Sequence, residues 1–170
     1  LRTATADEMI QLLGSNEVDL AYTLDQPILQ PNLVLASNVL EPVCVVAPPD
    51  HPLAQQAVVT LEELAQQEFL LTERGMSYRD ALDQCMDAHH LVLKPYIELG
   101  SAAMLAEMVE RGMGLSFLPE YIVRNELAAP RLNVPECQVT MHRQLFYHRD
   151  KWVTPQMKVF IELVQQNLQE

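Results

Sequence analysis

The sequence predicts an α/β fold, in which helices and strands alternate along the chain. The clearest part is the stretch 98–120, ELGSAAMLAEMVERGMGLSFLPE. Ser101 follows a strand end and can cap a helix whose apolar residues recur at helical spacing. Gly112 suits the left-handed position that ends a helix, and Leu115–Leu118 is a short apolar run. A strand, a helix and a strand in this order predict a parallel crossover.

The other elements follow from capping and from apolar runs. Thr5-x-x-Glu8 and Thr60-x-x-Glu63 are capping boxes that begin two helices, and Ser77-x-x-Asp80 predicts a third helix that ends near His89. Thr154 and Pro155 predict the start of a final helix. The segment 119–127 is predicted as a further helix. Apolar or alternating runs predict strands at 18–22, 33–39, 43–47, 69–71, 95–99, 132–134, 139–141 and 145–147.

Length and charge exclude several functions. A chain of 170 residues can bury one good core or two small ones. Its net charge is −12, with 11 basic against 23 acidic residues and no basic run, so this chain is not expected to bind DNA itself. No apolar run approaches the roughly 18 residues of a membrane helix. Residues 1–10 do not resemble a signal peptide.

The reactive side chains form no catalytic or metal-binding pattern. Cys44, Cys85 and Cys137 are far apart in sequence, which predicts a reduced, cytoplasmic protein with no close thiol pair. Cys85 and His89 are spaced for one helix face, with His90 beside them, but CxxC and HExxH patterns are absent. GxSxG and P-loop patterns are absent too. We therefore expect no enzyme, no metal and no cofactor.

Three ordered segments carry a family resemblance. They are L..EVDLA at 13–21, HPLA at His51–Ala54 and V..G.G.SFLP at 109–119. On these three segments taken together, the chain resembles the effector-binding domain of LysR-type transcriptional regulators over essentially its whole length. The resemblance implies two subdomains of the type 2 periplasmic-binding-protein kind, joined by two strands that cross near 41–45 and 140–145. Subdomain I would comprise 1–40 plus 144–170, and subdomain II would comprise 41–143.

The resemblance also implies a different start for the domain. Family members carry another strand and helix before the point that corresponds to residue 1. We therefore expect subdomain I to be incomplete, with exposed apolar surface and an unpaired strand edge.

The expected ligand site is a cleft between the subdomains, at strand ends and helix N-termini. A small, anionic effector would bind there. Thr5, Ser77 and Ser101 have an alternative role as helix caps, and Tyr22 could be an ordinary core aromatic. Arg74 or Arg79 could add a bidentate contact to an anion. The candidate ligand-binding residues are Thr3, Thr5, Tyr22, Thr23, Thr72, Glu73, Ser77, Gly100 and Ser101.

The predicted function is that of an effector-sensing domain in a transcription regulator. The partners implied by the resemblance are a small-molecule effector, further copies of the chain in a dimer or tetramer, and DNA only through an N-terminal domain outside this chain. Two alternatives are a solute-binding protein of a transport system, which has the same fold, and a small α/β enzyme. The HPLA and GMGLSFLP segments favour the regulator.

Overall fold

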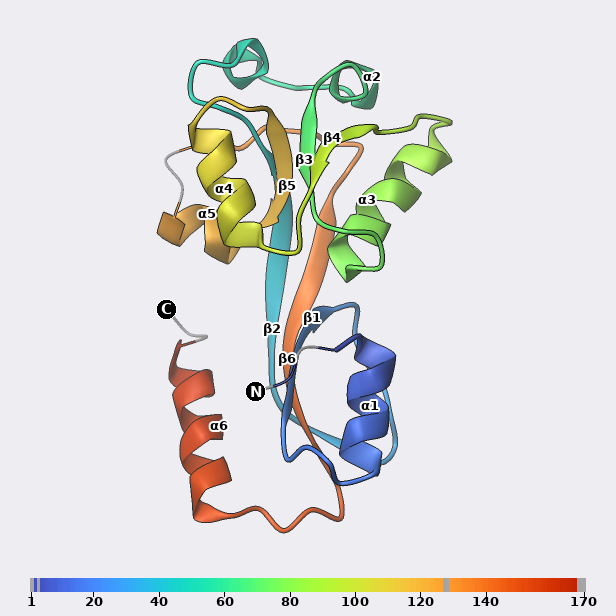
Figure 1. Ribbon diagram of the computed structural model, residues 1–170, viewed down its shortest axis with the longest axis vertical. Coiled ribbons are helices and arrows are strands. Elements are labelled where there is room, and N and C mark those ends of the chain that lie inside the picture. The colour runs from blue at the N-terminus through green and yellow to red at the C-terminus, as the bar shows by residue number, and fades with distance from the viewer. Residues whose placement is uncertain (1, 3, 127–128, 168–170) are drawn as a thin grey trace. The chain divides into compact units, whose positions relative to one another are not determined.

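The computed structural model describes residues 2, 4–126 and 129–167. It confirms the α/β class, with a six-stranded sheet in the order β1-β6-β2-β5-β3-β4 (Figure 1). None of its described helices is long and apolar enough to cross a membrane. The elements are α1 (Ala6–Gly14), β1 (Ala21–Asp25), β2 (Leu33–Val46), the 3-10 helix η1 (Pro52–Gln55), α2 (Leu61–Leu64), β3 (Phe69–Leu71), α3 (Ser77–Ala88), β4 (Pro95–Glu98), α4 (Ala102–Glu110), β5 (Leu115–Pro119), α5 (Glu120–Glu126), β6 (Val139–His148) and α6 (Pro155–Asn167).

The chain divides into two compact units. Unit 1 comprises Leu1–Leu40 and Met141–Glu170, and unit 2 comprises Glu41–Thr140. Strands β2 and β6 each contribute residues to both units.

Both of these strands are longer than the sequence predicted. Two predicted segments merge into each, because the polar residues between them find partners. Glu41 accepts a hydrogen bond from the backbone of Tyr121 at 2.8 Å. The amide of Gln144 accepts from Ile28 N at 2.9 Å and donates to Gln26 O at 3.0 Å. The predicted strand at 132–134 is wrong, since only a single bridge, between Val46 and Arg131, forms near it.

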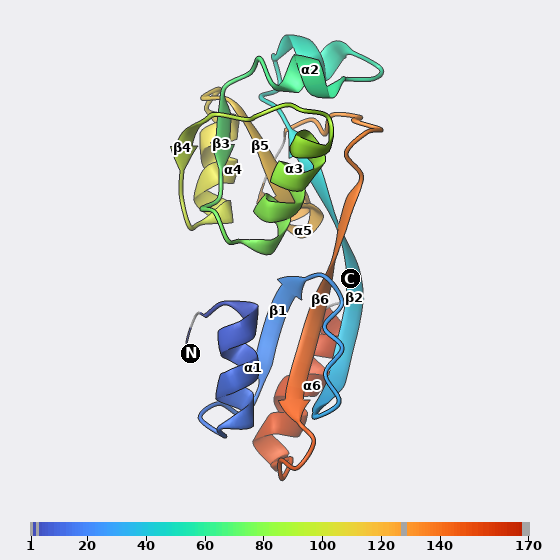
Figure 2. The ribbon, with the colours of Figure 1, turned by 90° about the vertical axis from the view of Figure 1, so that its right-hand side faces the viewer.

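In unit 2, helices cover both faces of the sheet (Figures 1 and 2). β3 pairs in parallel with β4 and with β5, so α4 makes the predicted crossover from β4 to β5. On one face Leu70 and Leu118 belong to a buried cluster with residues of α4 and α5. On the other face the rings of Tyr78 in α3 and Phe117 in β5 lie 6.5 Å apart. Alternate strand residues therefore support opposite helices.

Unit 1 is a smaller assembly. β1 pairs antiparallel with β6, and Ala21 and Phe146 are partners in that pairing. Leu13 of α1 packs with both of them in a small buried cluster. α6 lies on the other side of these strands from α1 (Figure 1). Its described residues bury only Met157, and large apolar side chains stay exposed at Val159, Phe160 and Leu163 of the helix and at Trp152 before it.

Most helix ends follow the predicted caps. The capping boxes at Thr5 and Thr60 form in full, and Ser101 and Thr154 accept hydrogen bonds from Met104 N and Met157 N, both at 3.3 Å.

Ser77 is an exception, because it is the first residue of α3 rather than its cap. The N-cap is Met76, whose carbonyl accepts from Asp80 N at 3.0 Å. Asp80 does not reach back to the cap as in a capping box. Its carboxylate accepts instead from Gly75 N at 3.1 Å, so the helix begins one residue earlier than predicted.

Candidate functional site

Two neighbouring strand ends in unit 2 bring four predicted ligand-binding residues together. β3 and β4 are parallel, with Leu71 and Glu98 as partners, and Leu99 N donates to Leu71 O at 3.1 Å. The residues that follow each strand therefore leave the same edge of the sheet side by side. We call Thr72, Glu73, Gly100 and Ser101 the strand-end site.

Ser101 and Gly100 form the entrance to α4. Ser101 caps the helix through its hydroxyl, and both residues are exposed. A Cβ added to Gly100 would lie 3.7 Å from Glu73 Oε1, so the Glu73 carboxylate lies directly beside Gly100. The first turn of α4 contains no acidic residue of its own. Glu73 therefore supplies a negative charge close to the positive end of the helix dipole.

Thr72 is 1% exposed, and its hydroxyl oxygen makes no hydrogen bond of standard geometry. It nevertheless lies near enough to the Tyr78 hydroxyl to affect it. Burial raises the pKa of Tyr78 to about 12, and the contact with Thr72 acts in the opposite direction. The wall of the site behind Thr72 is thus a buried, uncharged phenol.

Arg79 fixes the two strand ends. Its side chain is 1% exposed, and Nε donates to both carboxylate oxygens of Asp83 at 3.0 Å. Nη1 donates to Thr72 O at 2.8 Å and to Glu98 Oε1 at 3.0 Å. Nη2 is also buried and makes no hydrogen bond. The sequence suggested Arg79 as a ligand contact, whereas its guanidinium is occupied in joining α3 to the ends of β3 and β4; Arg74 is exposed.

The remaining candidates lie outside the strand-end site, either at the start of α3 or in unit 1. Ser77 is partly buried at the start of α3. Thr3 lies outside the described residues. Thr5 caps α1, and Tyr22 is 44% exposed on β1. Thr23 is buried beside it, and its hydroxyl makes no hydrogen bond. A ligand role for each of these residues stays a prediction.

Two clusters were missed by the sequence reasoning. Glu120 of α5 pairs with Arg124 at 2.9 Å and with Arg131. Cys85 and Cys137 interact through their side chains, although the sequence predicted no close thiol pair. Glu120 and Arg124 have the four-residue spacing of a pair on one helix, but Arg131 and the Cys85–Cys137 pair have no local signal, because those partners come from separate elements. The ring of His89 bonds to Cys85 O at 3.0 Å, and the described residues include no group of three or more His, Cys, Asp or Glu that could hold a metal.

Comparison with known proteins identifies the family. The family model described as the LysR substrate binding domain matches residues 1–169. The HTH-type transcriptional regulator YwqM of Bacillus subtilis is 32% identical over 156 residues, which are 90% of this chain and 52% of that protein. A RuBisCO operon transcriptional regulator of Acidithiobacillus ferrooxidans is 31% identical over 157 residues, 91% of this chain and 50% of that protein.

Solved structures agree on the fold. The regulatory domain of CcmR from Synechocystis PCC6803, in complex with 2-PG, has a TM-score of 0.80 at 21% identity and covers 100% of this chain and 83% of that one. The chain spans about half the length of the curated relatives it matches. With a family match over nearly every residue, this chain belongs to the LysR substrate-binding domain family.

Proposed function

We propose that the chain is the effector-sensing part of a transcription regulator and that the strand-end site contributes to effector binding. The observation that supports this most directly is the convergence of Thr72 and Ser101 at adjacent parallel strand ends, which is where ligands bind in open α/β sheets. The Thr72 hydroxyl has no strong partner of its own, and the N-terminus of α4 offers backbone N–H groups.

The charges at the site define the effector more closely. A carboxylate or phosphate oxygen suits the N–H groups and hydroxyls near Ser101. Glu73 is acceptor-only and lies beside Gly100, so it would repel a plain anion but accept from a hydroxyl or an ammonium group. We therefore propose an effector that combines an acidic group with a hydrogen-bond donor, such as a hydroxy acid or an amino acid.

Sensing requires that the effector prefers one conformation of the regulator over another. DNA contact would then be made by a separate domain, since this chain carries a net charge of −12. A dimer or tetramer of the whole regulator in the cytoplasm is part of the proposal. The transport alternative is not favoured, because the relatives are transcription regulators. We propose no catalytic step.

A thermal-shift screen tests the proposal. Hydroxy acids, amino acids, simple carboxylic acids and inorganic anions are compared, since a ligand of the native state raises the melting midpoint. Ser101→Asp keeps a helix cap but adds a negative charge, so we expect it to weaken binding at least about tenfold. Glu73→Gln should weaken the binding of effectors that carry a hydrogen-bond donor more than the binding of effectors that carry none.

The matched control is Thr154→Asp, which makes the same change at the cap of α6 in unit 1 and should leave binding unchanged. A hit that Ser101→Asp does not affect would place the ligand elsewhere. A screen without hits, together with a full-length protein that fails to bind DNA, would overturn the sensing role itself.

A further inference from the structure

Cys85 and Cys137 form a thiol pair that joins two separate elements of unit 2. Cys85 lies in α3, and Cys137 lies in the segment that leads into β6. Cys85 Sγ donates to the backbone oxygen of Glu136 at 3.3 Å, which places it next to Cys137. The Cys85 side chain also contributes to the raised pKa of the Cys137 thiol, as neighbouring thiols do. A disulfide requires such an approach of two side chains.

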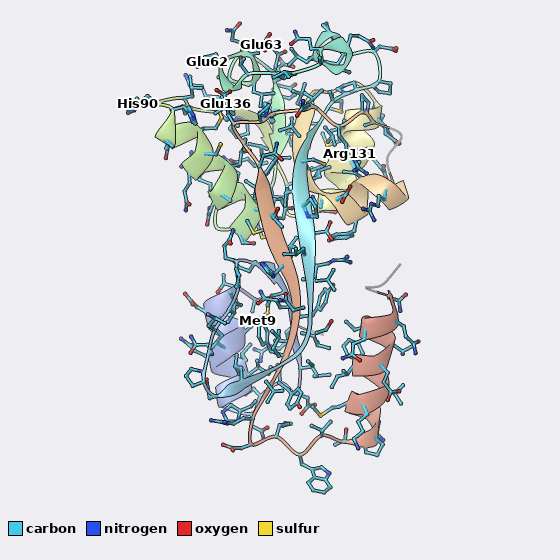
Figure 3. The ribbon with its side chains drawn as sticks, turned by 180° about the vertical axis from the view of Figure 1, so that it is seen from behind. Met9, Glu62, Glu63, His90, Arg131 and Glu136 are labelled. Atoms are coloured by element: carbon cyan, nitrogen blue, oxygen red, sulfur yellow. The ribbon has the colours of Figure 1, made fainter. Side chains whose placement is uncertain are left out.

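The segment that carries Cys137 is held in place on several sides. Cys137 N donates to Val134 O at 3.1 Å. The carboxylate of Glu136 accepts from Leu61 N at the start of α2 at 3.2 Å (Figure 3). Asn133 Nδ2 donates to Ala57 O at 3.0 Å, and Asn133 O accepts from Val59 N at 2.9 Å. The two cysteines therefore lie next to each other on two fixed elements, so their proximity is a property of the fold.

The two thiols differ in access. Cys137 is 6% exposed, whereas Cys85 is partly exposed on α3. Burial, with a further contribution from Cys85, raises the pKa of Cys137 to about 12. Cys137 is therefore almost entirely protonated at neutral pH and unreactive toward a reagent in solution. An external reagent meets Cys85 first.

We propose that Cys85 and Cys137 are a reversible oxidation site, at which a low-molecular-weight disulfide converts the pair into an intramolecular disulfide. No described cluster offers the third ligand that a metal would need, so thiol–disulfide exchange is the chemistry that this pair supports. The inference does not depend on the ligand that the strand-end site binds.

The reaction takes place in two exchanges. The Cys85 thiolate attacks one sulfur of the oxidant RSSR, so that a Cys85–SR bond forms, the S–S bond of RSSR breaks and one thiolate leaves. Cys137 then loses its proton and attacks the Cys85 sulfur, the Cys85–SR bond breaks and the second thiolate leaves. The protein loses two electrons and two protons, and RSSR is reduced to two thiols. Reduction by a dithiol reverses both exchanges.

The product would tie α3 to the segment before β6. α3 also carries Arg79, which holds the ends of β3 and β4. The cross-link closes a loop of about fifty residues, and such a link stabilises mainly by restricting the unfolded chain. We expect the oxidised protein to melt several degrees above the reduced protein, with full reversal by dithiothreitol.

Oxidised glutathione is the probe for the test. The reduced protein is incubated with it, free thiols are alkylated, and non-reduced peptides are mapped by mass spectrometry. We expect one internal linkage, between residues 85 and 137, with Cys44 alkylated. Cys137→Ser should trap a glutathione adduct on Cys85, and Cys85→Ser should form at least about tenfold less adduct on Cys137.

Cys44→Ser is the matched control, because Cys44 is also partly buried and its pKa is raised to about 11 by burial. This variant should form the 85–137 linkage as the parent does. A urea-unfolded sample shows that the reagent is active. If the folded protein stays fully reduced while the unfolded chain reacts, or if the linkage includes Cys44, the proposal is wrong. The two single variants also test the order of attack. If Cys85→Ser forms as much adduct on Cys137 as Cys137→Ser forms on Cys85, the proposed order is wrong.

Discussion

The buried carboxylate of Glu41 accepts a hydrogen bond from the backbone N–H of Tyr121 at 2.8 Å. Glu41 lies in β2 and is 3% exposed, while Tyr121 is the second residue of α5. The N–H groups in the first turn of a helix have no partner within the helix, and a negative charge there is favourable. One side chain in the middle of a long strand therefore serves as the cap of a helix that is far away in sequence.

Glu41→Ala should lower the free energy of unfolding by about 2–3 kcal/mol, because the partly buried N–H of Tyr121 would lose this charged acceptor. Glu41→Gln keeps an acceptor oxygen and should cost less. Urea denaturation followed by circular dichroism measures both. Glu107→Ala, at an exposed position of α4, should change stability by less than about 0.5 kcal/mol. Equal losses for the Ala and Gln variants of Glu41 would contradict the capping role.

Arg79→Met should destabilise the protein by about 2–3 kcal/mol, at or below the ~3–5 kcal/mol lost when a fully buried ion pair is broken. Asp83 and Glu98 are partly exposed, so water replaces part of the hydrogen bonding that they lose with the guanidinium. The backbone oxygen of Thr72, in contrast, loses a buried donor. The control is Arg111→Met, which removes an exposed pair with Glu107 and should have almost no effect. A loss at Arg79 no larger than that at Arg111 would show that the guanidinium does not hold the strand ends.

Tyr78 should make stability fall at alkaline pH. Burial raises its pKa to about 12, above the value of 10.0 expected in the unfolded chain. Below pH 10 both states bind the proton; between pH 10 and 12 the unfolded state releases it first, so folding becomes less favourable as pH rises. We expect about 1–2 kcal/mol of the alkaline loss to disappear in Tyr78→Phe.

Urea denaturation at pH 9 and pH 11, on Tyr78→Phe and on the parent, measures this difference. Tyr96→Phe is the control, because Tyr96 lies on β4 with 64% of its surface exposed. If the Tyr78 and Tyr96 variants lose equal stability between pH 9 and pH 11, the pKa of Tyr78 is not raised in the folded protein.

Gly114→Ala should be among the more damaging single changes in unit 2. The backbone at Gly114 has φ +147, and a Cβ there would lie 2.6 Å from Glu68 O. That same oxygen accepts a hydrogen bond from Leu115 N at 2.9 Å, so it cannot move away freely. We expect a loss of roughly 3 kcal/mol or more. Gly14→Ala, where a Cβ meets nothing within 4 Å, should be neutral in the same denaturation experiment.

The features that the sequence predicted well are local ones. The capping boxes of Thr5 and Thr60 depend on a spacing of three residues, and the crossover through α4 depends on periodicity within one stretch. Features that depend on distant partners were missed. The strands predicted on either side of Glu41 and of Gln144 are continuous in the structure, because these polar residues find partners in α5 and in the loop after β1.

The candidate site shows the same division. Thr72 and Ser101 were selected because they follow strands, and the parallel pairing of β3 with β4 brings them to one edge. The role of Arg79 was not predictable from spacing alone, because only Asp83 lies on the same helix, whereas Thr72 and Glu98 lie at the ends of β3 and β4. The thiol pair has no sequence signal, since Cys85 and Cys137 meet only once α3 and the segment before β6 are folded.

The pairing of β1 with β6 also has a consequence for synthesis. Ala21 and Phe146 are partners, yet Phe146 is translated about 125 residues later, roughly 6–25 s at ~5–20 residues per second. Unit 2 is one continuous stretch and can fold while the ribosome is still working. The edge of β1 that pairs with β6 stays without its partner throughout that interval. We therefore expect the nascent N-terminal segment to be a substrate for chaperones.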